Sequence, residues 1–238
     1  MPRSARHAPG GFVFHCLNRG VGRRTLFRQE KDFDAFERVL AECLATEPGV
    51  GLLAYCIMSN HWHLLLRPAG DGQLARFMQR LTITHSRRWQ EHYREVGLGH
   101  VYQGRFKSFP VQEDPHFLTV ARYVERNPVR AKLVKRAEAW RWGSLWRRRH
   151  GGAAARAILA EWPVDRPPDY LAWVNRPQTA AEEKAELAAL RLSVARGRPF
   201  GAPAWQERTA EALGLQSTLR PNGRPRKRLT AEATLATE

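Results

Sequence analysis

The sequence predicts an α+β sandwich, in which helices pack on a central antiparallel sheet. Short runs of alternating aromatic and β-branched residues are typical of strands. Longer segments carry apolar residues three and four positions apart, as amphipathic helices do. These segments follow one another as strand, helix, strand, strand, helix and strand over residues 12–111, and one further helix follows. This order is typical of a ferredoxin-like sandwich.

Each element has a signal at its end as well as along its length. Asn18-Arg19-Gly20 is expected to close the first strand as a turn, and Glu47-Pro48-Gly49 to end the first helix. The short turn Ser59-Asn60 makes the second and third strands a hairpin. Asn127-Pro128 stops the last of these helices. Strands are expected at residues 12–17, 51–58, 61–67 and 101–111, and helices at residues 31–45, 73–93 and 115–126.

The composition changes after about Lys135, so we expect one domain at residues 1–135 and a helical, basic C-terminal extension at residues 136–238. The extension begins with tryptophans interleaved with arginines between residues 140 and 149. Helices are expected at residues 180–195 and 204–213. Residues 220–228 are basic and contain proline and glycine, a composition that does not form a packed core. We therefore expect a flexible basic tail over about residues 215–238.

Charge limits the classes of partner. The 238 residues include 39 Lys and Arg against 23 Asp and Glu, a formal charge of +16. Such a chain attracts polyanions, so nucleic acid is the expected partner and an anionic membrane the second alternative. We expect no membrane contact, because no apolar run approaches the roughly 20 residues of a spanning helix and residues 1–11 lack the apolar stretch of a signal peptide. Three widely spaced cysteines indicate a reducing cytoplasm.

Two histidines stand two residues apart in an apolar, strand-like run. His61 and His63 flank Trp62 and precede three leucines. Side chains in a strand repeat every second residue, so the two imidazoles are expected on one face. Two imidazoles on one face can share a divalent metal. On a strongly basic protein, such a metal suggests chemistry on phosphate.

A tyrosine and an asparagine in the helix predicted at residues 115–126 offer further groups. Tyr123 and Asn127 stand four residues apart, one helical turn, so both can face the same point if the helix extends that far. The amide oxygen of Asn127 suits Mg²⁺ or Mn²⁺. The phenol of Tyr123 has a pKa near 10 when unperturbed, so its attack on phosphorus requires removal of its proton as the bond forms.

Each of these residues also has an ordinary structural interpretation. A histidine pair in a strand is also consistent with a hydrogen-bonded core pair. A tyrosine followed by Asn-Pro is consistent with a packing residue and an asparagine cap. The chain combines a histidine pair, a Tyr123–Asn127 pair distant from it in sequence, and a basic surface. This combination favours the functional interpretation over the structural one.

The same residues carry a family resemblance. Residues 55–66, Tyr-Cys-Ile-Met-Ser-Asn-His-Trp-His-Leu-Leu-Leu, resemble the HUH motif (His, bulky apolar, His) of single-tyrosine transposases of the IS200-like type. Residues 101–107, Val-Tyr-Gln-Gly-Arg-Phe-Lys, resemble that family's central element. Residues 123–134 are similar to its Tyr-x-x-x-Asn-Pro-Val-Arg-Ala segment, and the C-terminal residues 196–201 and 217–227 resemble the branch called REP-associated tyrosine transposases.

The resemblance implies the HUH nuclease fold and a metal-dependent reaction on single-stranded DNA. Tyr123 would attack a phosphodiester, forming a 5′-phosphotyrosine and a free 3′-OH, with His61, His63 and Asn127 as metal ligands. The substrate would be hairpins of imperfect extragenic palindromes. The resemblance further implies a monomer acting in a bacterial cytoplasm, at the nucleoid.

Several basic residues are candidate DNA contacts. Arg105 and Lys107 are two apart on the strand predicted at residues 101–111 and would face one side, suitable for phosphates. Arg130 lies just past Asn127. In the tail, Arg-Pro-Arg beside a glycine suits a narrow minor groove, which makes Arg224, Arg226 and Lys227 candidates as well.

Two rival functions remain at this point. A non-catalytic, sequence-specific nucleic-acid-binding regulator on the same fold would keep the basic surface, but binding alone does not require His61, His63, Tyr123 and Asn127 together. A zinc-stabilised structural protein would recruit Cys16 or Cys56 to the histidine pair, but no CxxC partner accompanies either cysteine. The sequence favours the transposase-type nuclease.

Overall fold

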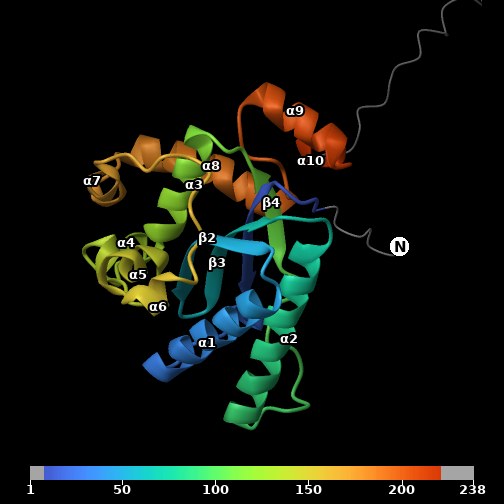
Figure 1. Ribbon diagram of the computed structural model, residues 1–238, viewed down its shortest axis with the longest axis vertical. Helices are drawn as coiled ribbons and strands as arrows, with labels where there is room; N and C mark the ends of the chain where they lie inside the picture. The colour runs from blue at the N-terminus through green and yellow to red at the C-terminus, as the bar shows by residue number, and fades with distance from the viewer. Residues whose placement is uncertain (1–7, 221–238) are drawn as a thin grey trace, which may run out of the picture.

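The computed structural model describes residues 8–220 and has a four-stranded antiparallel sheet at its centre (Figure 1). The strands are β1 (Val13–Arg19), β2 (Val50–Met58), β3 (His61–Pro68) and β4 (Lys107–Val111). Their order across the sheet is β2-β3-β1-β4, and every neighbouring pair is antiparallel. This is the strand order of a ferredoxin-like sandwich, so the predicted fold class is confirmed.

Helices cover both faces of the sheet (Figure 1). Helices α1 (Glu30–Thr46) and α2 (Gln73–Tyr93) pack on one face, and α3 (Pro115–Glu125) packs on the other. Successive residues of a strand point to opposite faces, so Trp62 lies in the core under α1 and α2, whereas Leu65 lies in the core under α3. The histidines on either side of Trp62 therefore face α3.

The helix and strand boundaries differ from the sequence prediction by at most two residues in every predicted element except the last strand. The turn predicted at residues 18–20 is wrong in its first two residues, because Asn18 and Arg19 still belong to β1 and pair with Trp62 and His61 of β3. The strand predicted at residues 101–111 is wrong over its first half, since β4 begins at Lys107.

Residues 101–103 stay hydrogen-bonded to the end of β1 without forming a regular strand: the N–H of Val21 donates to Val101 and that of Gln103 donates to Arg19. The hydroxyl of Tyr102 accepts a hydrogen bond from Trp62 Nε1 at 3.0 Å and lies 2.7 Å from His85 Nδ1 on α2. This network holds Tyr102 in the core under α1 and α2, with a single bridge to Gly20. The next three residues, Gln103, Gly104 and Arg105, are exposed, and β4 begins at Lys107.

The C-terminal extension is helical, as expected. The predicted helices are present as α8 (Ala180–Arg196) and α9 (Pro203–Ala212). The remaining elements are short: η1 (Val21–Arg23), α4 (Asn127–Arg130), η2 (Ala137–Ala139), α5 (Ser144–His150), α6 (Ala153–Arg156), α7 (Tyr170–Asn175) and α10 (Gln216–Leu219).

The extension meets the sheet at both of its outer strands. Along β2, the backbone N–H of Ile57 donates to Trp142 and that of Ala160 donates to Leu52. Along β4, the N–H of Phe200 donates to Pro110, and Gln112 donates back to Phe200. The extension is thus hydrogen-bonded to the same sheet that carries the histidine pair.

The first tryptophans of the extension are packing residues rather than exposed stacking surfaces. Trp140 donates its indole N–H to the carbonyl of Ile57 at 2.9 Å, and Trp142 stacks on Phe33 of α1 with ring centroids 4.2 Å apart. They hold the extension to the sheet and to α1. Within residues 8–220, no helix is long and apolar enough to cross a membrane.

Candidate active site

The histidine pair lies at the start of β3, on the face that α3 covers. The ring centroids of His61 and His63 are 5.0 Å apart and the rings are nearly perpendicular. His63 is buried and His61 is partly exposed. The strand thus presents both imidazoles to one point, as the two-residue spacing predicted.

Both imidazoles are held at Nδ1. His61 Nδ1 lies 2.6 Å from Oδ1 of Asn60, and because an amide oxygen only accepts, this nitrogen carries the proton. His63 Nδ1 lies 2.9 Å from Nε2 of His15 on β1. Burial and the positive charge of Arg19 lower the pKa of His61 to about 4, and burial together with the neighbouring His61 lowers the pKa of His63 well below its usual value. Both rings are therefore neutral at pH 7, the form that binds metals.

His15 was not among the predicted site residues, yet its side chain contacts His63 directly. Its side chain is fully buried between His63 and Phe109, with ring centroids at 5.1 and 4.8 Å. Burial lowers its pKa to about 3, and its Nδ1 has no hydrogen-bond partner among residues 8–220. One signal was available: His15 is a polar residue at an inward-facing position of the first strand, between Val13 and Leu17.

Tyr123 lies against this group from the C-terminal part of α3. Its ring centroid is 5.5 Å from that of His63 and 6.1 Å from that of His15, with edge-to-face geometry in both cases. The side chain is mostly buried, with 9% of its surface exposed. The structure therefore brings the histidine pair of one strand, His61 and His63, together with Tyr123 of a helix distant in sequence.

Asn127 follows one turn later and contacts the same tyrosine through the backbone. Its Nδ2 donates to the carbonyl oxygen of Tyr123 at 3.0 Å. The backbone N–H of Arg126 donates to Arg122 and α4 begins at Asn127, so the helical path continues past the end of α3. Its Oδ1 accepts a hydrogen bond from Arg130. The guanidinium carbon of Arg130 lies 4.6 Å from the Tyr123 ring centroid. Arg130, predicted only as a DNA contact, therefore lies directly against the tyrosine.

The donor set fits a divalent metal at the two histidines. Neither Nε2 has a hydrogen bond within residues 8–220, and both imidazoles are neutral. Asn127 fits less simply, because Arg130 already occupies one of the two lone pairs of its amide oxygen. Among the described residues, no three His, Cys, Asp or Glu side chains cluster as a metal site, so a third ligand would be this oxygen, water or substrate.

The cysteines do not complete a zinc site. Cys56 pairs with His63 across β2 and β3, but burial raises the pKa of its thiol far above the usual value, so it remains protonated. Cys16 packs in the core on the opposite face, under α1 and α2. Because zinc binds the thiolate, neither position supports the zinc-stabilised alternative.

A groove of about 890 Å³ lies beside the candidate site, between β1, β4 and the C-terminal extension. Leu17 lines it and pairs with both His63 and Lys107, which places the groove next to the histidines. Basic side chains line the groove: Arg19, Arg105, Lys107 and Arg196. Two of the predicted DNA contacts are thus in one groove, whereas Arg224, Arg226 and Lys227 lie outside the described residues.

A comparison with known protein families identifies the family to which these residues belong. Residues 11–127 match the sequence model of the family described as "Transposase IS200 like". Over these residues the chain belongs to the IS200-like transposase family, and the resemblance carried by the motifs is confirmed. Membership of this family indicates a transposase, which is a DNA-processing enzyme.

Two solved structures are similar in fold. A REP-associated tyrosine transposase bound to a REP hairpin shares the fold with a TM-score of 0.50 and 19% identity, over 70% of this chain and 95% of that chain. A putative transposase from Deinococcus radiodurans R1 is similar with a TM-score of 0.37 and 16% identity, over 56% of this chain and 92% of that chain. A comparison with curated protein sequences found no match.

Proposed function

We propose that this chain is a transposase-type endonuclease and strand transferase for single-stranded DNA, with Tyr123 as its nucleophile. The observation that carries the proposal is the position of Tyr123, whose ring lies edge-to-face against His63 and beneath Arg130. A phosphate at the phenol oxygen would lie near a guanidinium and near two neutral imidazoles. A tyrosine that served only to pack the core would not require these neighbours.

The proposed step exchanges one phosphate ester for another. The phenol oxygen of Tyr123 forms a bond to phosphorus, and the bond from phosphorus to the 3′-oxygen of the preceding nucleotide breaks. The phenol loses a proton and the departing 3′-oxygen gains one, so the products are a 5′-phosphotyrosine and a free 3′-OH. Attack by a 3′-OH on the phosphotyrosine reverses the exchange and joins strands without an external energy source.

The residues of the site have distinct roles in this proposal. His61 and His63 would hold a divalent metal, Mg²⁺ or Mn²⁺, through Nε2, with Asn127 as the third protein ligand. When bound, the metal would polarise the phosphate and neutralise developing charge. His15 holds the ring of His63 through its Nδ1, as outer partners of metal-binding histidines commonly do. Arg130 orients Tyr123 and Asn127 and lies where it can also contact the scissile phosphate.

The substrate strand is proposed to follow the groove lined by Arg19, Arg105 and Lys107. Its charge suits a phosphate backbone, and it lies beside the candidate site. The solved relative is bound to a REP hairpin, and we propose hairpin-forming extragenic palindromes as the substrate here. The catalytic domain would span residues 1–135 and the extension residues 136–238, acting as a monomer at the nucleoid of a bacterial cytoplasm.

The Tyr123→Phe variant tests the nucleophile. It removes the attacking oxygen but keeps the ring that contacts His63 and Arg130. Incubation with a labelled hairpin oligonucleotide should give a covalent protein–DNA adduct with the wild-type chain and none with the variant, while gel-shift affinity stays within about twofold. Cleavage that persists in Tyr123→Phe would refute the mechanism. If the wild-type chain binds the hairpin but never cleaves it, the non-catalytic regulator is the better description.

The metal is tested separately. The His61→Ala variant and wild-type protein treated with EDTA should both lose cleavage, and added Mg²⁺ or Mn²⁺ should restore only the wild type. Cleavage that is insensitive to EDTA would contradict the metal role while leaving the role of Tyr123 intact.

A further inference from the structure

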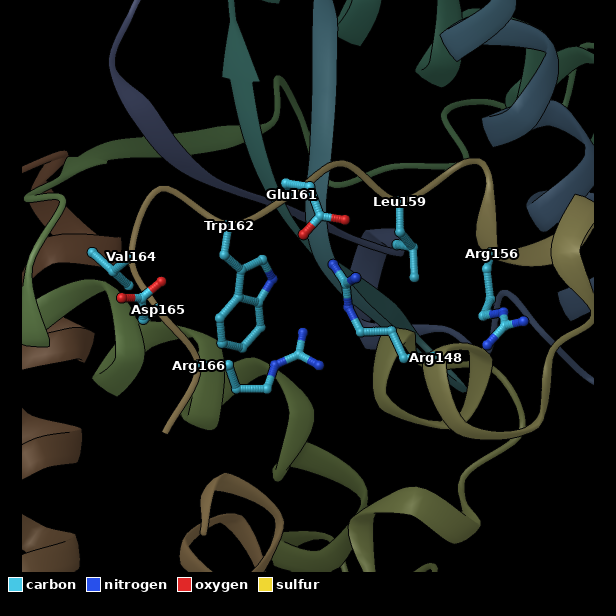
Figure 2. A pocket seen from close by; sticks show the side chains of 8 residues that line it. All are labelled: Arg148, Arg156, Leu159, Glu161, Trp162, Val164, Asp165 and Arg166. Carbon is cyan, nitrogen blue, oxygen red and sulfur yellow. The ribbon is translucent and has the colours of Figure 1, made fainter. Parts of the chain in front are cut away.

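A pocket of about 440 Å³ lies away from the candidate active site, between α5, α6 and the segment at residues 157–166 (Figure 2). Three arginines line it: Arg148, Arg156 and Arg166. It shares no lining residue with the catalytic group or with the groove described above. The transposase function proposed above makes no use of these residues.

The arginines converge around one indole. The guanidinium carbons of Arg166 and Arg148 lie 4.2 and 5.7 Å from the centroid of the Trp162 ring. In Figure 2 the two guanidinium groups point toward the same space beside that ring. Trp162 is itself fixed, because its N–H donates to the carbonyl of Leu53 at 2.7 Å. The arrangement is therefore built on a rigid support.

The two guanidinium groups are under-satisfied in this arrangement. Arg148 donates from one terminal nitrogen to the carbonyls of Leu53 and Ala160, at 2.9 and 3.1 Å, but its buried Nε has no hydrogen-bond partner in the part of the chain that the structure describes. Arg166 makes no hydrogen bond or ion pair with the described part of the chain; its observed contacts are with aromatic rings. Burial and the nearby charge of Arg166 lower the pKa of Arg148.

The neighbouring carboxylates form no ion pair with the pocket arginines within residues 8–220. Glu161 lines the pocket and interacts electrostatically with Arg148, whereas Asp165 lies on the far side of the indole in Figure 2. Buried Glu125 interacts electrostatically with both Arg148 and Arg166, but its two oxygens accept hydrogen bonds from Ser144 and Tyr170. The guanidinium groups of Arg148 and Arg166 thus line one cavity without a carboxylate bound between them.

We propose that this pocket is an anion site that takes a phosphate group between Arg148 and Arg166. Guanidinium groups bind phosphate through paired, charge-assisted hydrogen bonds, and the exposed guanidinium of Arg166 makes no hydrogen bond within residues 8–220 that a phosphate would have to displace. Arg156, which lines the pocket on the other side of Arg148 in Figure 2, adds a third positive charge. The phosphate can belong to a DNA strand or to a small phosphate ester, and the two sources are separable by experiment.

The test uses the full chain and two matched variants. Arg166→Gln removes an exposed member of the pair, whereas Arg149→Gln removes an exposed charge next to Arg148 in sequence that does not line the pocket. Inorganic phosphate is titrated by calorimetry, with sodium chloride at equal ionic strength as the reference. Wild type and Arg149→Gln should show saturable binding, and Arg166→Gln should bind at least tenfold more weakly.

Hairpin DNA then identifies the source. If the phosphate belongs to DNA, Arg166→Gln should flatten the dependence of log affinity on log salt by about one unit, as expected for one lost phosphate contact. If hairpin affinity and its salt dependence are unchanged while phosphate binding is lost, the site takes a small phosphate ester. If inorganic phosphate does not bind the wild-type chain and the salt slope is also unchanged in Arg166→Gln, the proposal is overturned. Neither readout depends on Tyr123, so the outcome is independent of the proposed function.

Discussion

Replacing His15 by phenylalanine should weaken metal binding at the candidate site without removing any metal ligand. The substitution keeps a ring of similar size between His63 and Phe109 but deletes Nε2, the group that lies 2.9 Å from His63 Nδ1. For His63 to offer Nε2 to a metal, its proton must lie on Nδ1, and His15 is the residue that accepts that proton's hydrogen bond. In the variant, this form of His63 has a buried N–H with no partner.

The size of the effect follows from the loss of an outer partner. In the metal-ready form of the wild type, neutral His15 carries its own proton on Nδ1, which has no partner within residues 8–220. The substitution therefore exchanges one unpartnered buried N–H for another, and what it removes is the group that fixes the proton and orientation of His63. Loss of an outer partner of a metal ligand commonly costs about 10–100-fold in affinity. We expect a 10–100-fold weaker affinity for Mn²⁺.

The assay is a titration of the full chain with Mn²⁺, in which free Mn²⁺ is followed by electron paramagnetic resonance. His85→Phe is the matched control, because His85 is also buried and hydrogen-bonded, to Tyr102 at 2.7 Å, but lies on α2 beneath the opposite face of the sheet. Its Mn²⁺ affinity should equal that of the wild type. Equal affinity in His15→Phe and wild type would refute the reasoning, as would equal losses in the two variants.

Three further predictions concern stability and DNA binding. Glu37→Gln should lower the free energy of unfolding by about 3–5 kcal/mol in urea denaturation, because buried Glu37 pairs with Arg147 at 2.7 Å. Asp34→Asn removes the charge from the exposed pair with Arg141 but keeps an oxygen that can accept the hydrogen bond of Trp142, so it should change this free energy by less than about 1 kcal/mol. Burial lowers the pKa of His85 to about 3, below its unfolded value, so its contribution to stability is present above pH 6.5 and is lost as pH falls toward 3. In His85→Phe, the acid-side slope of stability against pH should decrease by about 1.4 kcal/mol per unit, and an unchanged slope would contradict this. Deleting the chain after Leu219 should weaken hairpin binding and flatten its salt dependence; an unaltered slope would exclude the tail as a phosphate contact.

The first half of the fold was predictable because its signals are local. Helix α2 has the bounds that its apolar spacing predicted, Gln73–Tyr93, and the hairpin turn at Ser59 and Asn60 lies where two polar residues interrupt apolar runs. The strand predicted at residues 101–111 was too long because a strand-like sequence does not show where regular pairing stops. Tyr102 keeps a single bridge to Gly20, and its hydroxyl is hydrogen-bonded to Trp62 and His85 in the core.

The candidate site was predictable in its residue types but not in its contacts. Strand spacing was enough to place His61 and His63 together, and helical spacing related Tyr123 to Asn127. The hydrogen bond between His15 and His63 depends on the pairing of β1 with β3, which a lone histidine in a strand does not indicate. The hydrogen bond from Arg130 to Asn127 depends on the orientation of the Arg130 side chain in α4. Sequence spacing alone therefore did not show whether Arg130 contacts DNA or lies against Tyr123.

The hydrogen bonds between the extension and the sheet have a consequence for assembly. The outward N–H of Ile57 on β2 is taken by Trp142, and the carbonyl of Pro110 on β4 is taken by Phe200. Unpaired groups on an edge strand are a template for strands of other molecules. With these groups occupied from within, a second copy cannot lengthen the sheet without first displacing the extension. A chain that ends at residue 135 would lose the hydrogen bonds from the extension to both β2 and β4. We expect such a chain to aggregate through these two unpaired edge strands, even if every residue of the candidate active site remained in place.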